Sequence, residues 1–262
     1  MMRRSALFRY ARLILSLTAL DLRIRFAGSK LGLAWLILAP ALTVCAYVLL
    51  FGGILKVQVC ADCDRLSYGL LVVTGLLPWI GFSESVSRGT ASVLAQRNLM
   101  KSRVFPMEVI PVTAVCTGIL GQLAGTIMLI CGLFIFGKLS LTILFFPVLI
   151  VLQALLTVGL VWFLSCVNII YRDTSQMVSL GLLLLMFLSP IAYTPDMVPK
   201  ELAFVLAANP LAFLIEGYRD ILLFGRLPAL NSVGVFAGFA ALAGIAGHQY
   251  FMRLRRLLPD CV

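Results

Sequence analysis

The sequence predicts an all-α integral membrane protein, and three observations carry that prediction. The chain of 262 residues is 61% hydrophobic and only 12% charged, with a mean hydropathy of +1.06. Soluble domains average about 45–50% apolar and about 25% charged residues. Its uncharged runs have the length of membrane-spanning helices, and its 21 basic residues outnumber 11 acidic ones and concentrate between alternate runs. Composition therefore excludes both a soluble and a disordered chain.

Residues 1–30 are predicted to form an amphipathic helix that lies in the cytoplasmic surface of the membrane. At helical spacing one face is polar and another is apolar, with Ser5, Arg9, Arg12 and Ser16 on the first and Leu7, Tyr10, Ala11, Ile14 and Leu17 on the second. We do not expect a secretory signal peptide, because arginines interrupt the stretch and no A-x-A cleavage site follows. The alternative is a frayed basic tail.

Six uncharged runs predict six spanning helices, since a helix that crosses about 30 Å of hydrocarbon needs roughly 20 apolar residues. The runs have 25, 18, 29, 33, 22 and 26 residues and are, in order, Leu31–Leu55, Leu66–Ser83, Val109–Gly137, Leu139–Tyr171, Thr174–Pro195 and Leu227–Met252. Residues 1–262 are therefore predicted to be one transmembrane domain, with its membrane region at residues 31–252.

A seventh apolar run, Leu202–Ile215, has only 14 residues. As a helix it reaches about 21 Å at 1.5 Å per residue, which is too short to cross. Its Asn209-Pro210 pair marks a break, because proline lacks a backbone donor. Residues 196–226 are therefore predicted to form re-entrant helices on the outer side, between the fifth and sixth spans, where protein or water satisfies the backbone. Glu216 and Arg219 stand three residues apart there and are predicted to pair.

The basic residues also set the predicted orientation. With both termini inside, 15 basic and five acidic residues lie on the cytoplasmic side, and six of each lie outside. The net charge is then +10 inside and zero outside, as the excess of basic residues in cytoplasmic loops requires. Residues 253–262 are therefore predicted to be a cytoplasmic tail.

Motifs for chemistry are missing from the sequence. No G-x-x-x-x-G-K-[ST] loop occurs for nucleotide phosphates, and neither H-E-x-x-H nor G-x-S-x-G is present. A single His and scattered Cys residues argue against a metal site. The middles of the six runs hold no ionisable residue, which disfavours ion-coupled transport. We expect no catalytic residue and no metal or cofactor on this chain. We also expect a partner protein to supply the energy for any transport.

Two weaker patterns concern packing and cysteine chemistry. Gly121-x-x-x-Gly125 and Gly234-x-x-x-Gly238 indicate close helix–helix contact. Cys60 and Cys63 would lie in the first outer loop, where an oxidising environment permits a small disulfide.

Four stretches, in order, carry a resemblance to a known family. They are Arg23–Trp35 followed by Pro40; Gly75–Trp79 with Ser83-Glu84 and Ser87-Arg88-Gly89; Asn98–Lys101 with Phe105–Glu108; and Tyr171-Arg172-Asp173 with Ser189-Pro190, Asn209-Pro210-Leu211 and Glu216–Asp220. The chain resembles ABC-2 type permeases that export O-antigen, capsule or teichoic acid chains. One position departs from the family pattern, because Phe213 replaces a polar residue after Pro210-Leu211.

The resemblance implies a half-transporter of the bacterial inner membrane. Two copies of this chain would pair with two copies of an ATP-binding cassette subunit, which would bind ATP and Mg. The substrate would be a lipid-linked polysaccharide moved outward, with membrane lipids around it and no nucleic acid involved. The alternatives are an ABC-2 exporter of a drug or small lipid, and a membrane-embedded enzyme of glycan or lipid assembly.

Two basic clusters are candidate sites on the cytoplasmic side. The loop at residues 88–105 is expected to couple to the ATPase through Arg88, Arg97, Lys101 and Arg103, although these residues also serve positive-inside topology. Arg23, Arg25 and Lys30 are expected to receive the phosphate of a lipid-linked glycan, since guanidinium groups bind phosphate oxygens in pairs. The alternative for these three is attraction to anionic lipids.

The family lines its pore with the first and fifth spans, so aromatic residues there are candidates for contact with sugars. They are Trp35, Tyr47, Phe51, Phe187 and Tyr193, although aromatic residues are also common at membrane interfaces. The segment at residues 196–226 is expected to gate the outer mouth against a second copy. The Glu216–Arg219 pair would stabilise that gate, or would be merely structural.

Overall fold

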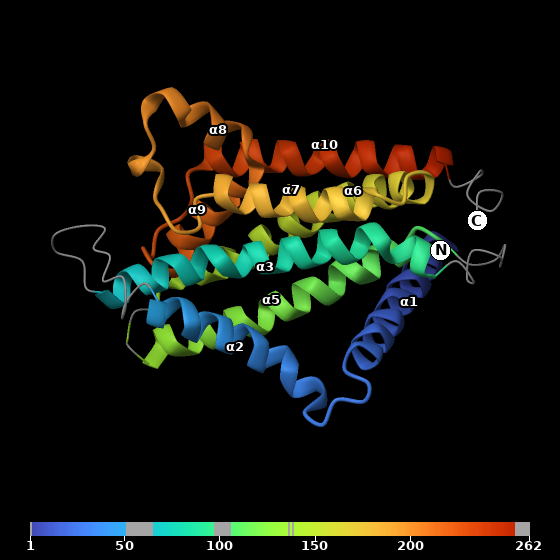
Figure 1. Ribbon diagram of the computed structural model, residues 1–262, viewed down its shortest axis with the longest axis horizontal. Coiled ribbons are helices and arrows are strands. Elements are labelled where there is room, and N and C mark those ends of the chain that lie inside the picture. Colours follow the sequence, from blue (N-terminus) through green and yellow to red (C-terminus); the bar gives the residue numbers. More distant parts are fainter. Residues whose placement is uncertain (1, 51–64, 97–105, 136, 138, 255–262) are drawn as a thin grey trace.

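The computed structural model describes residues 2–50, 65–96, 106–135, 137 and 139–254, and in these ranges the chain is helical and without strands. The longer helices are α1 (Met2–Arg25), α2 (Trp35–Val48), α3 (Arg65–Ala95), α5 (Val109–Ile135), α6 (Phe146–Ile170), α7 (Thr174–Leu188), α9 (Pro210–Leu222) and α10 (Leu230–Leu254) (Figure 1). Short helices are η1 (Gly32–Ala34), η3 (Leu141–Phe145), η4 (Pro195–Met197), η5 (Lys200–Leu202) and α8 (Ala203–Ala208). The all-α prediction is confirmed.

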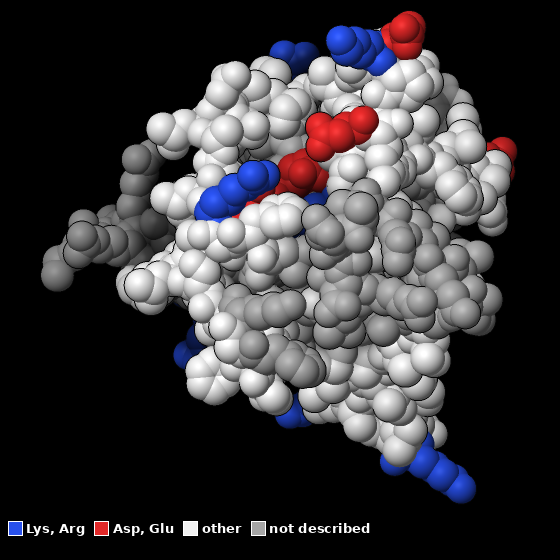
Figure 2. Space-filling model, turned by 90° about the vertical axis from the view of Figure 1, so that its left-hand side faces the viewer, with Lys and Arg blue, Asp and Glu red and all other residues white. Residues whose placement is uncertain are grey.

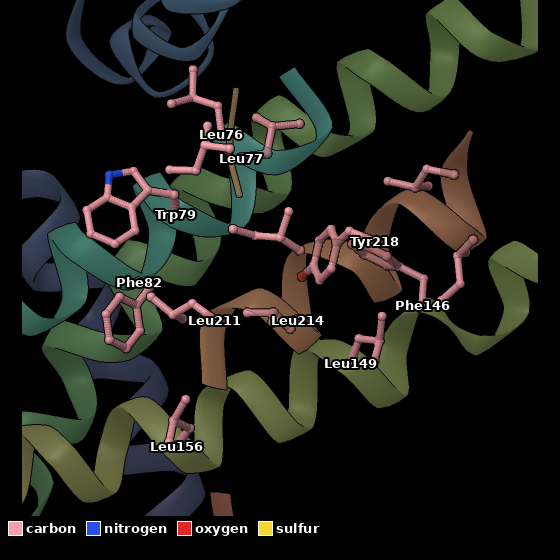
Figure 3. Close-up of a cluster of buried hydrophobic side chains, with 14 of the residues drawn as sticks. Leu76, Leu77, Trp79, Phe82, Phe146, Leu149, Leu156, Leu211, Leu214 and Tyr218 are labelled. Atoms are coloured by element: carbon pink, nitrogen blue, oxygen red, sulfur yellow. The ribbon is translucent and has the colours of Figure 1, made fainter. Parts of the chain in front are cut away.

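Helix α3 is the centre of the bundle. It packs against α2, α5, α6, α7 and α9, and 78% of its apolar window is buried. Figure 3 shows leucine and aromatic side chains of α3, α6 and α9 pointing toward one another in the main core. A helix that is apolar on all sides suits such a central position. Helix α10 packs instead on α6 and α9, and α1 packs mainly on α5.

The direction of each helix follows from its closest contacts. Gly81 on α3 lies against Gln122 on α5, and Gly118 on α5 lies against Ser85 on α3, so these two helices are antiparallel. Helices α3 and α6 are parallel. Pro78 on α3 accepts a hydrogen bond from Gln153 on α6, and further along both helices Gly89 on α3 approaches Val161 on α6. The start of α1 and the end of α10 lie at the same end of the bundle (Figure 1).

Among the described residues, four helices are long and apolar enough to cross a membrane: they occupy Tyr68–Ala95, Val109–Ile135, Leu141–Ile170 and Leu230–Leu254. The count becomes five if the bent pair Lys200–Ala208 and Pro210–Leu222 is taken as one span. The predicted first span is described only up to Leu50 and is helical as α2. The predicted fifth span, Thr174–Pro195, is too long by comparison with α7, which has 15 residues. Helix α7 ends at Leu188 because Pro190 disfavours helical backbone at the residue before it. That residue, Ser189, is accordingly extended (φ −92°, ψ 142°). Six full-length spans are therefore not what the described residues show.

The predicted break at Asn209-Pro210 is confirmed. The helices at Lys200–Ala208 and Pro210–Leu222 meet at a bend of 91°, and Pro210 begins α9 at the first helical position, where its missing donor costs nothing. Helix α9 reaches Leu222, so the helix extends seven residues beyond the predicted apolar run, which ends at Ile215.

Helices α7 and α9 lie in series along α3. Both pack on α3, and α9 lies beyond the end of α7 along the length of the bundle (Figure 1). Their facing ends are joined by a hydrogen bond of 2.9 Å from the Asn209 amide to the Ser189 hydroxyl. Together they hold 15 and 13 residues, which at 1.5 Å per residue gives about 42 Å of helix.

Two predicted boundaries are corrected. The sequence predicts a cytoplasmic loop at residues 88–105, but α3 continues to Ala95, so Arg88 lies within a helix. The reason is burial: Gly89, Thr90 and Val93 are packed inside the molecule. The N-terminal helix is confirmed but ends at Arg25, because Gly28 takes a positive φ of 80° and turns the chain.

Close packing of α6 on α10 uses glycines that the G-x-x-x-G pattern did not select. A Cβ on Gly247 would lie 2.0 Å from the Gly159 carbonyl oxygen, and one on Gly159 would lie 2.3 Å from the Ala243 backbone. By contrast, Gly234 and Gly238 have nothing within 4 Å among the described residues. Gly125 does approach α3, where its Cβ would meet Leu77 at 2.6 Å. The first pattern therefore marks a contact and the second does not.

Candidate functional site

The α7–α9 junction, defined here as residues 188–193 together with Asn209, Glu216 and Arg219, has a fully buried arginine at its centre. The Arg219 side chain is 0% exposed. Its guanidinium donates to the carbonyls of Ile191 at 2.9 Å and Tyr193 at 3.2 Å, and to the Glu216 carboxylate at 2.6 Å. The predicted Glu216–Arg219 pair is therefore present. In addition, Arg219 donates to two backbone carbonyls, which its spacing from Glu216 does not predict.

The carbonyls at the junction belong to the last residue of α7 and to the non-helical backbone that follows it. Leu188 accepts from the Tyr193 hydroxyl at 3.0 Å, and Ala192 accepts from the Tyr68 hydroxyl of α3 at 2.6 Å. With Arg219 on its neighbours, each carbonyl from residue 191 to 193 is bound by a side chain. Irregular backbone at membrane depth is tolerated only where protein or water satisfies it, and here side chains do so.

Asn209 joins the two helix ends in two ways. Its side-chain oxygen accepts from the Leu211 backbone N–H at 3.0 Å, which is the standard cap of a helix N-terminus. Its amide nitrogen donates to Ser189 at the end of α7, and both side chains are buried. One residue therefore begins α9 and ties it to α7.

The buried Arg219 lies outside the six predicted spans, in the segment predicted to be re-entrant, and α9 packs it against α3. A Cβ on Gly75, ten residues into α3, would lie 3.3 Å from an Arg219 nitrogen. A side chain at this position would therefore displace the guanidinium or the Ile191 carbonyl by a few tenths of an ångström. Helical spacing offered a signal, because Ile215, Arg219 and Leu222 stand on one apolar stripe that differs from the stripe of Phe213, Glu216 and Asp220.

A cavity of about 270 Å³ opens beside α9. Glu216 and Asp220 line it from α9, together with Phe213, whose ring is tilted against Phe239 at 6.5 Å. Asp220 pairs at 2.7 Å with Arg226, which is 66% exposed. Acidic and basic side chains gather in the upper part of the molecular face at the α8 end (Figure 2). Phe213, the residue that departs from the family pattern, therefore packs against α10 and also lines the cavity.

At the other end of the bundle, four residues form the α1–α3 charged cluster: Asp21, Arg25, Glu84 and Arg88. Arg25 pairs with Glu84, and Arg88 lies 2.7 Å from Asp21 and 3.5 Å from Glu84. Thr117 of α5 donates to Asp21 at 2.9 Å. Their side chains are 20–32% exposed, and their formal charges cancel. The cluster attaches α1 to α3 and α5.

This cluster changes the interpretation of two predicted site residues. Arg25, expected to bind a lipid phosphate, already has a carboxylate partner in Glu84, and Arg88, expected in the coupling loop, is held between two carboxylates. Arg23 and Lys30 are exposed, and no described side chain is ion-paired with either of them. Of the three predicted phosphate ligands, these two are presented to the surroundings.

The structure does not gather the predicted aromatic residues at one place. Trp35 donates to Ser29 at 3.1 Å at the start of α2, whereas Tyr47, near the other end of α2, packs beside Tyr68. Phe187 is 69% exposed at the end of α7, and Tyr193 is used at the junction. No ring contact links any two of these four.

Several predicted residues lie outside the described ranges: Phe51, Cys60, Cys63, Arg97, Lys101 and Arg103. Within those ranges, no group of three or more His, Cys, Asp or Glu side chains is placed to hold a metal ion. The motif residues that the structure does describe meet at two places: Gly75, Ser189, Asn209, Glu216 and Arg219 at the junction, and Arg25, Glu84 and Arg88 at the charged cluster.

Comparisons with known proteins find similarity along most of the chain. The ABC-2 type transporter family matches residues 12–223. The O-antigen export system permease protein RfbA of Myxococcus xanthus is 32% identical over 259 residues, covering 98% of this chain and 97% of the relative. The protein of that name from Klebsiella pneumoniae is 32% identical over 217 residues, 82% of each chain. The polysialic acid transport protein KpsM of Escherichia coli is 26% identical over 238 residues, covering 86% and 88%. The junction and the charged cluster both lie inside the family match.

Proposed function

This chain belongs to the ABC-2 type transporter family, and on that premise we propose that it is the permease subunit of an ATP-driven exporter of a lipid-linked polysaccharide. The observation that carries the proposal is the near full-length similarity to an O-antigen export permease. A second relative is named for polysialic acid transport. Both named cargoes are polysaccharides, which favours a glycan over a drug or small lipid, and transport over a biosynthetic reaction.

The charged cluster supports a placement of the bundle in the membrane. From Arg65 at one end of α3, 19 residues lead to Glu84, which at 1.5 Å per residue is about 28 Å, close to the roughly 30 Å of a hydrocarbon core. We assign this level to the inner surface of the bacterial inner membrane. Helix α1 then lies at the inner headgroups, both termini are cytoplasmic, and the α7–α9 junction is on the outer side.

In this placement the fifth span is an interrupted one. Helix α7 forms its inner part and α9 its outer part, while residues 189–208, with α8, leave the line of the span and return as a re-entrant excursion. With the run Leu31–Leu55 as the first span, the number of crossings is six. Packed against a second copy, the segment at residues 196–226 closes the outer mouth.

The inner end is the proposed docking site for two copies of an ATP-binding cassette subunit, which supply ATP and Mg. Helix α3 continues for 11 residues past Glu84 to Ala95, about 16 Å at 1.5 Å per residue, so it projects from the membrane toward that partner. The coupling residues are Arg97, Lys101 and Arg103, with Arg88 holding the base of the projection. Arg23 and Lys30 are the proposed ligands of the lipid phosphate.

Reconstitution tests the proposed function. The chain is purified with its ATP-binding subunit and placed in vesicles with that subunit outside, lipid-linked O-antigen in the bilayer and a glycan-degrading enzyme in the lumen. Adding ATP outside should cause glycan cleavage, and a variant partner that cannot hydrolyse ATP should not. The chain alone should hydrolyse no ATP. ATP-dependent uptake of a dye or short lipid, with the glycan untouched, would overturn the proposal.

A matched pair of variants tests the gate. Glu216→Gln leaves the buried Arg219 without its counter-charge, so the mouth should leak small solutes in vesicles that bear the complete complex. Asp220→Asn is the control, because its partner Arg226 is largely exposed and water replaces the lost contact. Equal leak in both variants would remove Glu216 from the gate.

A further inference from the structure

A second buried polar cluster lies in the apolar core, away from the junction. The Gln122 amide of α5 donates to the Tyr218 hydroxyl of α9 at 2.7 Å and to the Gln153 side-chain oxygen of α6 at 2.9 Å. The Tyr218 hydroxyl donates to that Gln153 oxygen at 3.0 Å, and Gln153 donates to the Pro78 carbonyl of α3 at 3.1 Å. We call Gln122, Gln153 and Tyr218 the amide–phenol cluster.

This cluster is built into the bundle with little room to spare. Its three side chains are at most 1% exposed, so neither substrate nor bulk water touches them. A Cβ on Gly81 would lie 2.0 Å from the Gln122 oxygen, so α3 is in direct contact with the cluster. The Tyr218 ring meets the Phe146 ring edge-on at 5.1 Å, and Figure 3 shows Tyr218 extending from α9 between α3 and α6. The hydroxyl is therefore bonded to two helices while its ring packs against one of them.

The two halves of the re-entrant segment differ in how they are held. Nine of the 13 residues of α9 are buried, and α9 is bonded both by the amide–phenol cluster and by Arg219 at the junction. The six residues of α8 include no buried one, and the side chain of Phe204 there is 68% exposed. Helix α9 is part of the core, whereas α8 lies on its surface.

We propose that Gln122, Gln153 and Tyr218 are positioning residues that hold α9 stationary against α5 and α6, so that the outer mouth opens by movement of α8 and residues 194–208 alone. This inference rests on the proposed export function. Hydrogen bonds are directional, so the cluster fixes both the depth and the rotation of α9, whereas apolar packing by itself tolerates sliding. A stationary α9 keeps Glu216 and Asp220 at the edge of the opening throughout the cycle.

The first test separates positioning from stability. Tyr218→Phe keeps the ring and removes the hydroxyl, and should raise solute leak from vesicles bearing the full complex several-fold. In the triple variant Gln122→Met, Gln153→Met, Tyr218→Phe the three side chains of the cluster become apolar together, and the Pro78 carbonyl that loses its bond from Gln153 lies inside helix α3, where it accepts a backbone bond. Replacing hydrogen-bond partners together by apolar groups is often nearly neutral for stability. Its thermal unfolding should match that of wild type while its leak remains high. A triple variant as tight as wild type would show that the cluster is only structural, and would overturn the proposal.

The second test fixes each half in place, using a background whose native cysteines are replaced by alanine. Gly217→Cys on α9 and Leu149→Cys on α6 replace two residues in contact, since a Cβ on Gly217 lies 3.1 Å from the Leu149 side chain. Bridging them with a short thiol crosslinker should leave ATP-dependent export unchanged.

The matched pair is Leu206→Cys on α8 and Ser232→Cys on α10, which line the same cavity. Bridging these two should abolish export, and reduction of a cleavable linker should restore it. Loss of export on joining α9 to α6, or normal export with α8 joined to α10, would overturn the proposal. Failure of the uncrosslinked complex to move glycan at all would instead count against the proposed function.

Discussion

At the α7–α9 junction a single arginine is fully buried and bonded to two backbone carbonyls and one carboxylate, whereas at the α1–α3 charged cluster four charges share a partly exposed site. The junction serves a place where the helix is interrupted and backbone groups need donors. The charged cluster joins the last turn of α1 to the uninterrupted helices α3 and α5, and its charges mainly neutralise one another. The same residue types therefore do different work, and the state of the local backbone decides which.

The energetics of the two places should differ accordingly. Removing one partner of a buried, hydrogen-bonded charge leaves uncompensated groups and costs about 3–5 kcal/mol. Exposed ion pairs are typically worth about 0.2–1 kcal/mol, and side chains that are 20–32% exposed lie nearer to that limit. The following predictions test this difference, from the largest expected effect to the smallest.

Arg219→Met should be the most damaging single change, costing about 3–5 kcal/mol of folding free energy. It removes the donor to the Ile191 and Tyr193 carbonyls and leaves Glu216 without a partner. Thermal unfolding of the detergent-solubilised protein measures the effect. Arg88→Met is the matched control and should cost far less, because water reaches its two carboxylate partners. Equal losses in the two variants would contradict the comparison.

Gly247→Ala and Gly159→Ala should each destabilise by about 1–3 kcal/mol, the usual cost of overpacking. Each added Cβ would lie 2.0–2.3 Å from backbone atoms of the facing helix, and backbone cannot move aside as a side chain does. Gly234→Ala is the control: nothing lies within 4 Å, so it should be neutral or gain up to about 1 kcal/mol of helix propensity. Comparable melting temperatures in all three variants would show that the close approach of α6 and α10 at Gly159 and Gly247 does not contribute to stability.

Asn209→Ala should cost about 1 kcal/mol, the usual value of a helix N-cap, with a further loss from the Ser189 contact. Asn209→Asp separates the two contributions, because a carboxylate still caps α9 but has no amide to donate to Ser189. The aspartate variant should therefore unfold at a temperature between those of wild type and the alanine variant. If it matches the alanine variant, the connection to α7 rather than the cap carries the stability.

Asp21→Asn should have the smallest effect, below about 1 kcal/mol, and the effect should shrink further in high salt, because salt screens exposed charges. The double variant Asp21→Arg with Arg88→Asp exchanges the two charges of the ion pair and should therefore unfold at nearly the temperature of wild type. The readout is thermal unfolding at low and high salt. A loss as large as that of Arg219→Met, or one that salt does not change, would show that this cluster behaves as a buried site.

The sequence predicted the long helices well, because their signal is local. Uninterrupted apolar stretches placed both ends of α5 and α10 within three residues of those observed, and the end of α6 within one. The stretch predicted for α6 begins seven residues early, because it includes the short helix η3. It also placed the break at Asn209-Pro210, since proline acts on its own backbone. It placed the end of α7 too late in the chain. Composition alone does not distinguish Pro190, which follows the end of α7, from Pro78, which lies inside the packed helix α3.

The candidate site was predictable only in part. The spacing of Glu216 and Arg219 was enough to predict their ion pair, because both partners stand on one helix turn. It did not reveal that Arg219 binds carbonyls of residues 191 and 193, which are more than 25 positions away in the sequence. Likewise, the sequence alone makes Arg25 a candidate phosphate ligand, whereas in the structure it pairs with Glu84 of α3.

What the sequence alone determined is therefore the set of elements and their apolar character, together with pairings a few residues apart, since these depend on periodicity and on local backbone chemistry. The tertiary structure decided which polar groups are buried and what they bind. It selected Gly159 and Gly247 over Gly234 and Gly238, and it placed Gln122, Gln153 and Tyr218 in one cluster. The physical reason is that burial and hydrogen-bond partners depend on how helices distant in sequence pack together, and no single segment encodes that arrangement.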